Sequence, residues 1–158
     1  MKLHFTYISV VIFLSGLSYT YAQNFRLPQV FMIGENEKEY ESMVKNHPLP
    51  LIAVCDNSME RAFDQWENLM SEIENHANNA GFDLKGFKIW VNVFWDKEGV
   101  IRHIVFYPKP VSRLINYDEF TSFLRSFMTT YRMDIQAHAH YSHFGSMSFP
   151  VFRGGTKG

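Results

Sequence analysis

The sequence predicts an α+β domain: a two-layer sandwich in which two long helices cover one face of an antiparallel sheet. Two long stretches with apolar residues at helical spacing, about residues 58–80 and 117–131, indicate the helices. Residues 87–107 alternate with the two-residue period of β-strands on either side of a turn, which indicates a hairpin. A chain of 158 residues is close to the roughly 150 residues of one domain and is long enough to bury a core. The predicted order is strand, helix, strand, strand, helix, strand.

Residues 1–22 have the parts of a secretory signal peptide. Lys2 precedes an apolar run over residues 8–14, and Thr20 and Ala22 place small residues before a cleavage site after Ala22. The apolar run is shorter than the about 20 residues of a transmembrane helix. We therefore expect an exported protein, periplasmic or extracellular, with no stable membrane anchor after cleavage. A segment kept as an uncleaved anchor is the alternative.

Charge and cysteine content limit the classes of function. The formal net charge is −1, and removal of residues 1–22 takes away Lys2 and no acidic residue, which leaves 14 basic against 16 acidic residues and a charge of −2. A charge this small excludes broad electrostatic binding to nucleic acid. Cys55 is the only cysteine, so no intramolecular disulfide can form and an exported domain must depend on its core.

Residues 23–50 form an N-terminal extension with a short helix in this prediction, and residues 51–152 form the single α+β domain. The short helix lies within residues 35–45 and ends before Pro48 and Pro50. The apolar run 51–55 that follows is consistent with a buried strand that carries the Cys55 thiol.

The first long helix has a capping-box spacing at its start, where Glu60 follows Asn57 by three residues. Gly81 supplies the residue that ends it. The second long helix starts at Asn116, with Glu119 at the same offset. Each helix presents one apolar stripe, so both can pack on the same sheet face.

The hairpin turns at Asp96-Lys97-Glu98-Gly99, which predicts a type I turn with a left-handed, bulged Gly99. This turn pairs Trp95 with Ile101. If the register continues unchanged, one face carries Ile89, Val91 and Val93. The opposite face then carries four large side chains: Trp90, Phe94, Ile104 and Phe106.

A closing strand follows the second helix, with Met147, Phe149 and Val151 on one side and Ser146 and Ser148 on the other. Residues 153–158 read as a disordered tail.

The hairpin sequence over residues 86–101, the helix over 117–131 and the closing segment 145–152, with its apolar-Pro-apolar-Phe ending, resemble TonB carboxy-terminal-like domains. The resemblance covers about residues 86–152. It implies the fold and a non-catalytic binding role. A Pro-rich linker like that of the energy transducers of that family is not evident, so the resemblance does not imply energy transduction.

The four side chains Trp90, Phe94, Ile104 and Phe106 form the candidate partner-binding surface. Together they exceed the apolar patch that a monomer normally exposes. Either the segment 24–50 covers them, or a protein partner or a second copy of the chain does. A free sheet edge offers the same kind of partner a strand-addition site. We therefore predict an exported, non-catalytic binding or structural domain that acts through its sheet edge or aromatic face.

The alternative function is metal binding. His138, His140 and His143 form a His-x-His-x-x-His run, and His138 and His140 share a face on an extended chain, where neutral imidazoles could bind Zn or Cu. A solvated polar loop gives the same pattern. Paired carboxylates in an apolar setting, a phosphate loop and a Ser/His/Asp order are not evident, so we expect no enzyme and no cofactor.

Overall fold

The computed structural model describes residues 27–152 and has the α+β, two-layer arrangement that the sequence predicts. The signal peptide predicted for residues 1–22 and the tail predicted for 153–158 lie outside the described residues. The elements are β1 (Val30–Met32), α1 (Glu37–Asn46), β2 (Leu49–Pro50), α2 (Leu51–Val54), α3 (Met59–Ala80), β3 (Lys88–Trp95), β4 (Ile101–Pro108), α4 (Tyr117–Thr130) and β5 (Tyr141–Ser148). Within residues 27–152, none of the helices combines the length and the apolar character that a membrane crossing requires.

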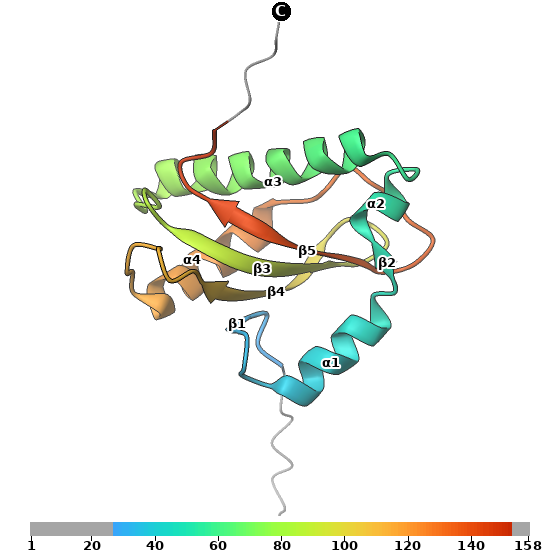
Figure 1. Cartoon of the computed structure of the whole chain (residues 1–158), viewed down its shortest axis with the longest axis horizontal. Helices are drawn as coiled ribbons and strands as arrows, with labels where there is room; N and C mark the ends of the chain where they lie inside the picture. Colours follow the sequence, from blue (N-terminus) through green and yellow to red (C-terminus); the bar gives the residue numbers. More distant parts are fainter. Residues whose placement is uncertain (1–26, 153–158) are drawn as a thin grey trace, which may run out of the picture.

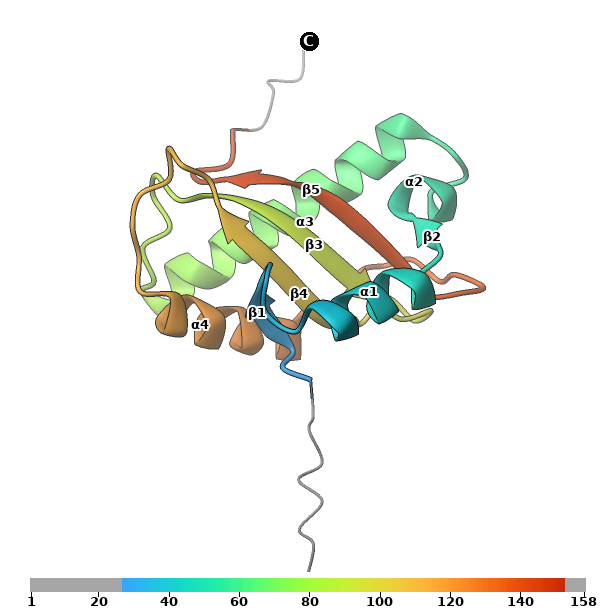
Figure 2. The same ribbon diagram turned by 60° about the horizontal axis from the view of Figure 1, so that its bottom comes forward.

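The five strands form one mixed sheet in the order β1-β4-β3-β5-β2 (Figures 1 and 2). The long strands β4, β3 and β5 are antiparallel, with β3 in the centre. The two short edge strands run parallel to their neighbours, β1 to β4 and β2 to β5. The sequence predicts an antiparallel sheet, whereas the observed sheet is mixed because its two edge strands are parallel to their neighbours. The segment 27–50, predicted as an extension, supplies β1, α1 and β2 to this same domain.

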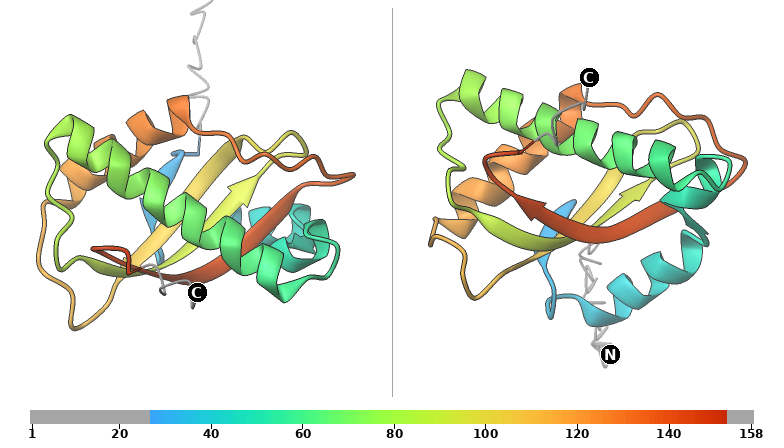
Figure 3. Two further views of the ribbon diagram at one scale, coloured as in Figure 1. Left: turned by 90° about the horizontal axis from the view of Figure 1, so that it is seen from above. Right: turned by 45° about the horizontal axis from the view of Figure 1, so that its top comes forward.

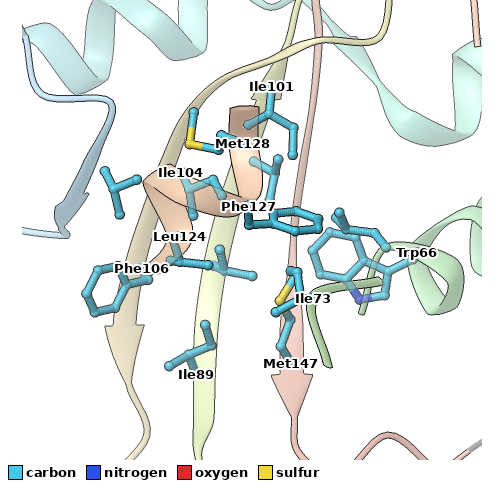
Figure 4. Packing of buried hydrophobic residues seen from close by; sticks show 14 of the residues in the cluster. Trp66, Ile73, Ile89, Ile101, Ile104, Phe106, Leu124, Phe127, Met128 and Met147 are labelled. Atoms are coloured by element: carbon cyan, nitrogen blue, oxygen red, sulfur yellow. The ribbon is translucent and has the colours of Figure 1, made fainter. Parts of the chain in front are cut away.

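Helices α3 and α4 cover one face of the sheet, and α1 lies on the opposite face (Figures 1 and 3). The main core fills the space beneath α3 and α4 and includes Trp66 and Ile73 of α3 and Leu124 and Phe127 of α4 (Figure 4). Its strand side includes Ile89. We call the face under α1 the outer face.

The helix ends follow the capping signals closely. The Asn116 side chain accepts hydrogen bonds from the backbone N–H groups of Asp118 and Glu119, as predicted. At the start of α3 the cap is Ser58 and not Asn57, because the Ser58 hydroxyl accepts the Arg61 N–H at 3.2 Å.

The strand predicted for residues 51–55 is wrong. Residues Leu51–Val54 form the single helical turn α2, with Pro50 as its extended N-cap and a hydrogen bond from the Cys55 N–H to the Leu51 carbonyl at 3.1 Å. A short apolar run has no period that separates a strand from a buried helical turn, which is the reason for the error. Cys55 is fully buried, and burial raises the pKa of its thiol.

The placement of Ile104 and Phe106 on the outer face is also wrong. The predicted turn forms, with Gly99 at φ +82° and Trp95 opposite Ile101. A β-bulge between Phe94 and Trp95 then shifts the register, so that Phe94 lies opposite His103. Because side chains alternate along a strand, this shift moves every later residue of β4 to the other face. Ile104 and Phe106 consequently lie in the main core, where both are buried (Figure 4).

Candidate functional site

The outer face carries Trp90, Asn92 and Phe94 from the central strand β3. Their partners across the ladders are Tyr107, Val105 and His103 of β4 and Ser146, Phe144 and Ser142 of β5. Helix α1 covers the end near Phe94, where Met43 packs with Phe94, Val105 and Phe31 in a second, smaller cluster. Cover from within the chain, one of the two alternatives above, thus accounts for Phe94.

The other end of the outer face is open. Trp90, Tyr107 and Phe144, here called the aromatic strip, are 38%, 47% and 58% exposed. The rings of Trp90 and Tyr107 stack with centroids 6.4 Å apart. The Lys109 ammonium lies 5.4 Å from the Trp90 ring centroid and also donates to the Ser146 hydroxyl. These contacts hold Trp90 and Tyr107 in place and leave both rings partly exposed.

Of the four side chains predicted as a partner surface, the structure leaves one exposed. Trp90 belongs to the aromatic strip, Phe94 lies under α1, and Ile104 and Phe106 lie in the main core. Tyr107 and Phe144 were missed, the first because of the register shift and the second because β5 starts earlier than the predicted closing strand.

One edge of β5 lies next to this strip. The short strand β2 pairs only with Tyr141 and Ser142, so within residues 27–152 no strand pairs with the outer edge of residues 143–148 (Figure 2). The N–H of Phe149 donates to Phe87 O, toward β3. Because N–H groups alternate in direction along an antiparallel strand, those of Phe144 and Ser146 point away from β3, toward the free edge of the sheet.

The outer edge of β5 is partly protected by α3. The Trp66 indole N–H donates to the Ser146 carbonyl at 3.3 Å, which satisfies one outward acceptor of the edge. Such partial cover is a common way to limit unwanted pairing at an edge strand.

The three histidines of the predicted metal site are not brought together. His143 packs on the Trp66 ring of α3, with centroids 4.5 Å apart, whereas His140 packs on His47 beside α1, at 5.3 Å. His143 thus lies on the α3 side of the sheet and His140 on the α1 side, and His138 is exposed. In the part of the chain that the structure describes, no group of three or more His, Cys, Asp or Glu side chains is arranged to hold a metal ion.

His140 instead belongs to a cavity of about 730 Å³ at the C-terminal end of α1. We call it the histidine cavity. Three separate segments line it: the end of α1, the β3–β4 hairpin and the loop before β5. Its lining residues are Met43, Asn46, His47, Pro48, Lys97, Arg102, His103, Ala139 and His140. No periodic pattern joins these segments in the sequence, so sequence reasoning missed the site.

Two of the cavity's imidazoles are fixed by hydrogen bonds to backbone carbonyls. His47 Nδ1 lies 2.7 Å from Met43 O, and His103 Nδ1 lies 3.0 Å from Pro28 O. Each Nδ1 therefore donates its proton, because a carbonyl can only accept. Burial lowers the pKa of both rings below the usual value, so both are mainly neutral at pH 7.

Comparisons of the chain with protein-family models, with curated proteins and with solved structures find no match.

Proposed function

We propose that this chain is an exported, non-catalytic binding domain that takes up an extended segment of a partner protein by strand addition at β5. The observation that carries the proposal is the unpaired outer edge of residues 143–148 beside the aromatic strip. Backbone hydrogen bonds at such an edge supply affinity, and side-chain contacts supply specificity.

The aromatic strip supports the same conclusion. The Trp90 and Tyr107 rings are held by stacking, and Trp90 also by Lys109, so little conformational entropy of these two side chains is lost when a partner covers them. Phe144 belongs to both the strip and the edge. Its side chain lies on the outer face, and its N–H lies in the plane of the sheet and points away from β3 at the free edge. Tyrosine, tryptophan and phenylalanine are also the residues enriched at the centres of protein interfaces.

The resemblance to TonB carboxy-terminal-like domains supports a binding role by analogy only. The elements β3, β4, α4 and β5 follow in the order on which the resemblance depends. Export depends on the signal peptide predicted for residues 1–22.

Strand addition predicts selective loss of peptide binding in Phe144→Pro. Proline removes the outward N–H and leaves the inner ladder intact, as at other edge positions that tolerate proline. The wild-type chain should enrich extended peptides from a random displayed library. An enriched peptide should bind Phe144→Pro about fivefold more weakly than Phe144→Ala, since one backbone hydrogen bond contributes about 1 kcal/mol. Fluorescence anisotropy measures both affinities.

Phe144→Ala is the matched control because it removes the ring and keeps the N–H. Trp90→Ala should weaken binding of the same peptide, because it removes a ring of the aromatic strip and leaves the β5 edge unchanged. Equal affinities for Phe144→Pro and Phe144→Ala would exclude the β5 edge as the binding site. A dimer of the wild-type chain in sedimentation that Phe144→Pro dissociates would identify a second copy as the partner.

Export predicts a mature chain that begins at Gln23. Expression in a host with a secretory pathway should give an intact mass that corresponds to cleavage after Ala22. A membrane-associated chain that retains Lys2 would instead identify the segment as an anchor.

A further inference from the structure

The histidine cavity has basic residues and no acidic residues in its described lining. Its lining residues include Lys97, Arg102, Asn46 and three histidines, and none of those described is Asp or Glu. Its volume of about 730 Å³ falls within the roughly 300–1,000 Å³ of pockets that hold small molecules. It shares no residue with the aromatic strip.

One residue of the cavity lining, His47, has a buried polar atom that lacks a partner. His47 is only 8% exposed, and its Nε2 has no hydrogen-bond partner among the residues that the structure describes. Its Nδ1 is already used by Met43 O, so Nε2 is the atom left for another group. Buried polar atoms in folded proteins are almost always paired, and an orphan atom therefore requires an explanation.

Two further imidazoles and one aromatic ring lie around His47, and two cationic residues lie elsewhere in the cavity lining. His140 faces its ring from the loop before β5, and His103 faces it from β4, while the Phe94 ring packs edge-on at 5.0 Å. Lys97 and Arg102 lie on the hairpin side of the cavity. Asp96 pairs with Arg102 and offsets part of that charge.

From this arrangement we infer that the histidine cavity binds a small molecule bearing an oxyanion, a carboxylate or a phosphate. Lys97 and Arg102 attract the anion at the hairpin side, and His140 and His47 donate to it. Focusing of positive charge in a concave site favours such a ligand. A protonated His47 donates from both ring nitrogens, which gives Nε2 the partner that it lacks.

This site takes up protons when it is filled. In the free protein His47 and His103 are neutral at pH 7 because burial lowers their pKa. A bound anion favours the charged imidazolium and raises these pKa values. Affinity should therefore increase as the pH falls from 7.5 to 6.0, by up to about tenfold per pH unit for one proton taken up.

The test is an NMR titration of the full chain with inorganic phosphate and, separately, with succinate, at constant ionic strength and at pH 6.0 and 7.5. We expect the ring signals of His47, His103 and His140 to shift, with an affinity about fivefold or more higher at pH 6.0. The His76 and His138 signals should not shift. A response to only one of the two probes would identify which oxyanion the cavity takes.

Two exposed lining residues give variants that should fold. Lys97→Ala and His140→Ala should each weaken binding about fivefold, the effect of losing one ionic contact of about 1 kcal/mol. Their matched controls are Lys109→Ala, on the aromatic strip, and His138→Ala, two residues from His140 and outside the cavity lining. Both controls should bind as the wild type does.

Three results would overturn the inference. The first is the absence of any shift with either probe, and the second is unchanged binding in both Lys97→Ala and His140→Ala. The third is a shift of the same three rings with Zn²⁺ in anion-free buffer but not with phosphate or succinate, which would make this a metal site.

Discussion

Gly99→Ala is expected to lower the free energy of unfolding by about 3–5 kcal/mol, which combines backbone strain with a steric clash. Gly99 has φ +82°, a conformation that residues with a Cβ rarely adopt. An added Cβ would lie 2.2 Å from Met133 O. The clash separates the hairpin from the loop before β5, so the hydrogen bond from the Met133 N–H to Gly99 O is also at risk. Chemical denaturation measures the change.

Gly81→Ala is the control for this substitution. Gly81 also has positive φ, +68°, but an added Cβ would meet nothing within 4 Å. Gly81→Ala should therefore lower the free energy of unfolding only through the backbone strain that it introduces, about 1 kcal/mol. If Gly99→Ala is no less stable than Gly81→Ala, the contact between the hairpin and the loop does not contribute to stability.

The elements that could be predicted from the sequence are those with a strong local signal. The stripes of α3 and α4 fix the face that each helix buries, and the Asp96–Gly99 turn fixes the tip of the hairpin. These signals depend on residues within one or two turns of each other. The two-layer arrangement follows from them.

The errors arise where one residue decides the outcome or where an element is very short. The bulge at Phe94/Trp95 has no local signature in this sequence, yet it inverts the faces of β4 and moves Ile104 and Phe106 into the core. The strands β1 and β2 have three and two residues, too few to show a period. Their places are set by partners far along the chain.

The candidate sites were predictable only in part. Trp90 was found because it alternates with core residues on one strand. The histidine cavity was not, because His47, Lys97 and His140 come from three segments that meet only in the folded chain. The histidine run predicted His140 as a site residue together with His138 and His143, whereas in the structure His140 lies against His47. Spacing in sequence is a poor guide when alternate residues of a strand face opposite sides.

Asp96→Asn is expected to lower the free energy of unfolding by about 2–3 kcal/mol at pH 7, the loss of charge-assisted hydrogen bonds at a buried carboxylate. Asp96 is only 3% exposed. Its Oδ1 accepts the N–H groups of Glu98 at 3.0 Å and Val100 at 2.9 Å, and its Oδ2 pairs with Arg102. Asparagine keeps one acceptor but directs an amide N–H₂ toward a guanidinium, which has no acceptor.

The difference between Asp96→Asn and the wild type should depend on pH. Burial alone would raise the pKa of Asp96, but the hydrogen bonds from Val100 and Arg102 outweigh burial and hold it below its usual value. A depressed pKa stabilises the folded state above the unfolded pKa of about 3.9. That stabilisation is lost as the pH falls through the lower, folded-state value. The difference should shrink from pH 5 toward pH 2, measured by denaturation at each pH.

Asp83→Asn is the surface control. Asp83 pairs with Arg113 at 3.4 Å, but both side chains are largely exposed, so its loss should cost about 0.5 kcal/mol or less. A difference for Asp96→Asn that persists unchanged to pH 2 would show that its effect comes from shape and not from the carboxylate charge.

Asp96→Asn also separates fold stability from the histidine cavity. The substitution removes the carboxylate that offsets Arg102, and Arg102 lines the cavity. The freed guanidinium should then strengthen phosphate binding by a few-fold, since an uncompensated charge near the surface interacts by about 1 kcal/mol or more with an anion. One substitution would thus weaken the fold and strengthen the site. Weaker phosphate binding in a folded Asp96→Asn chain would mean that Arg102 needs Asp96 to hold its position in the cavity wall.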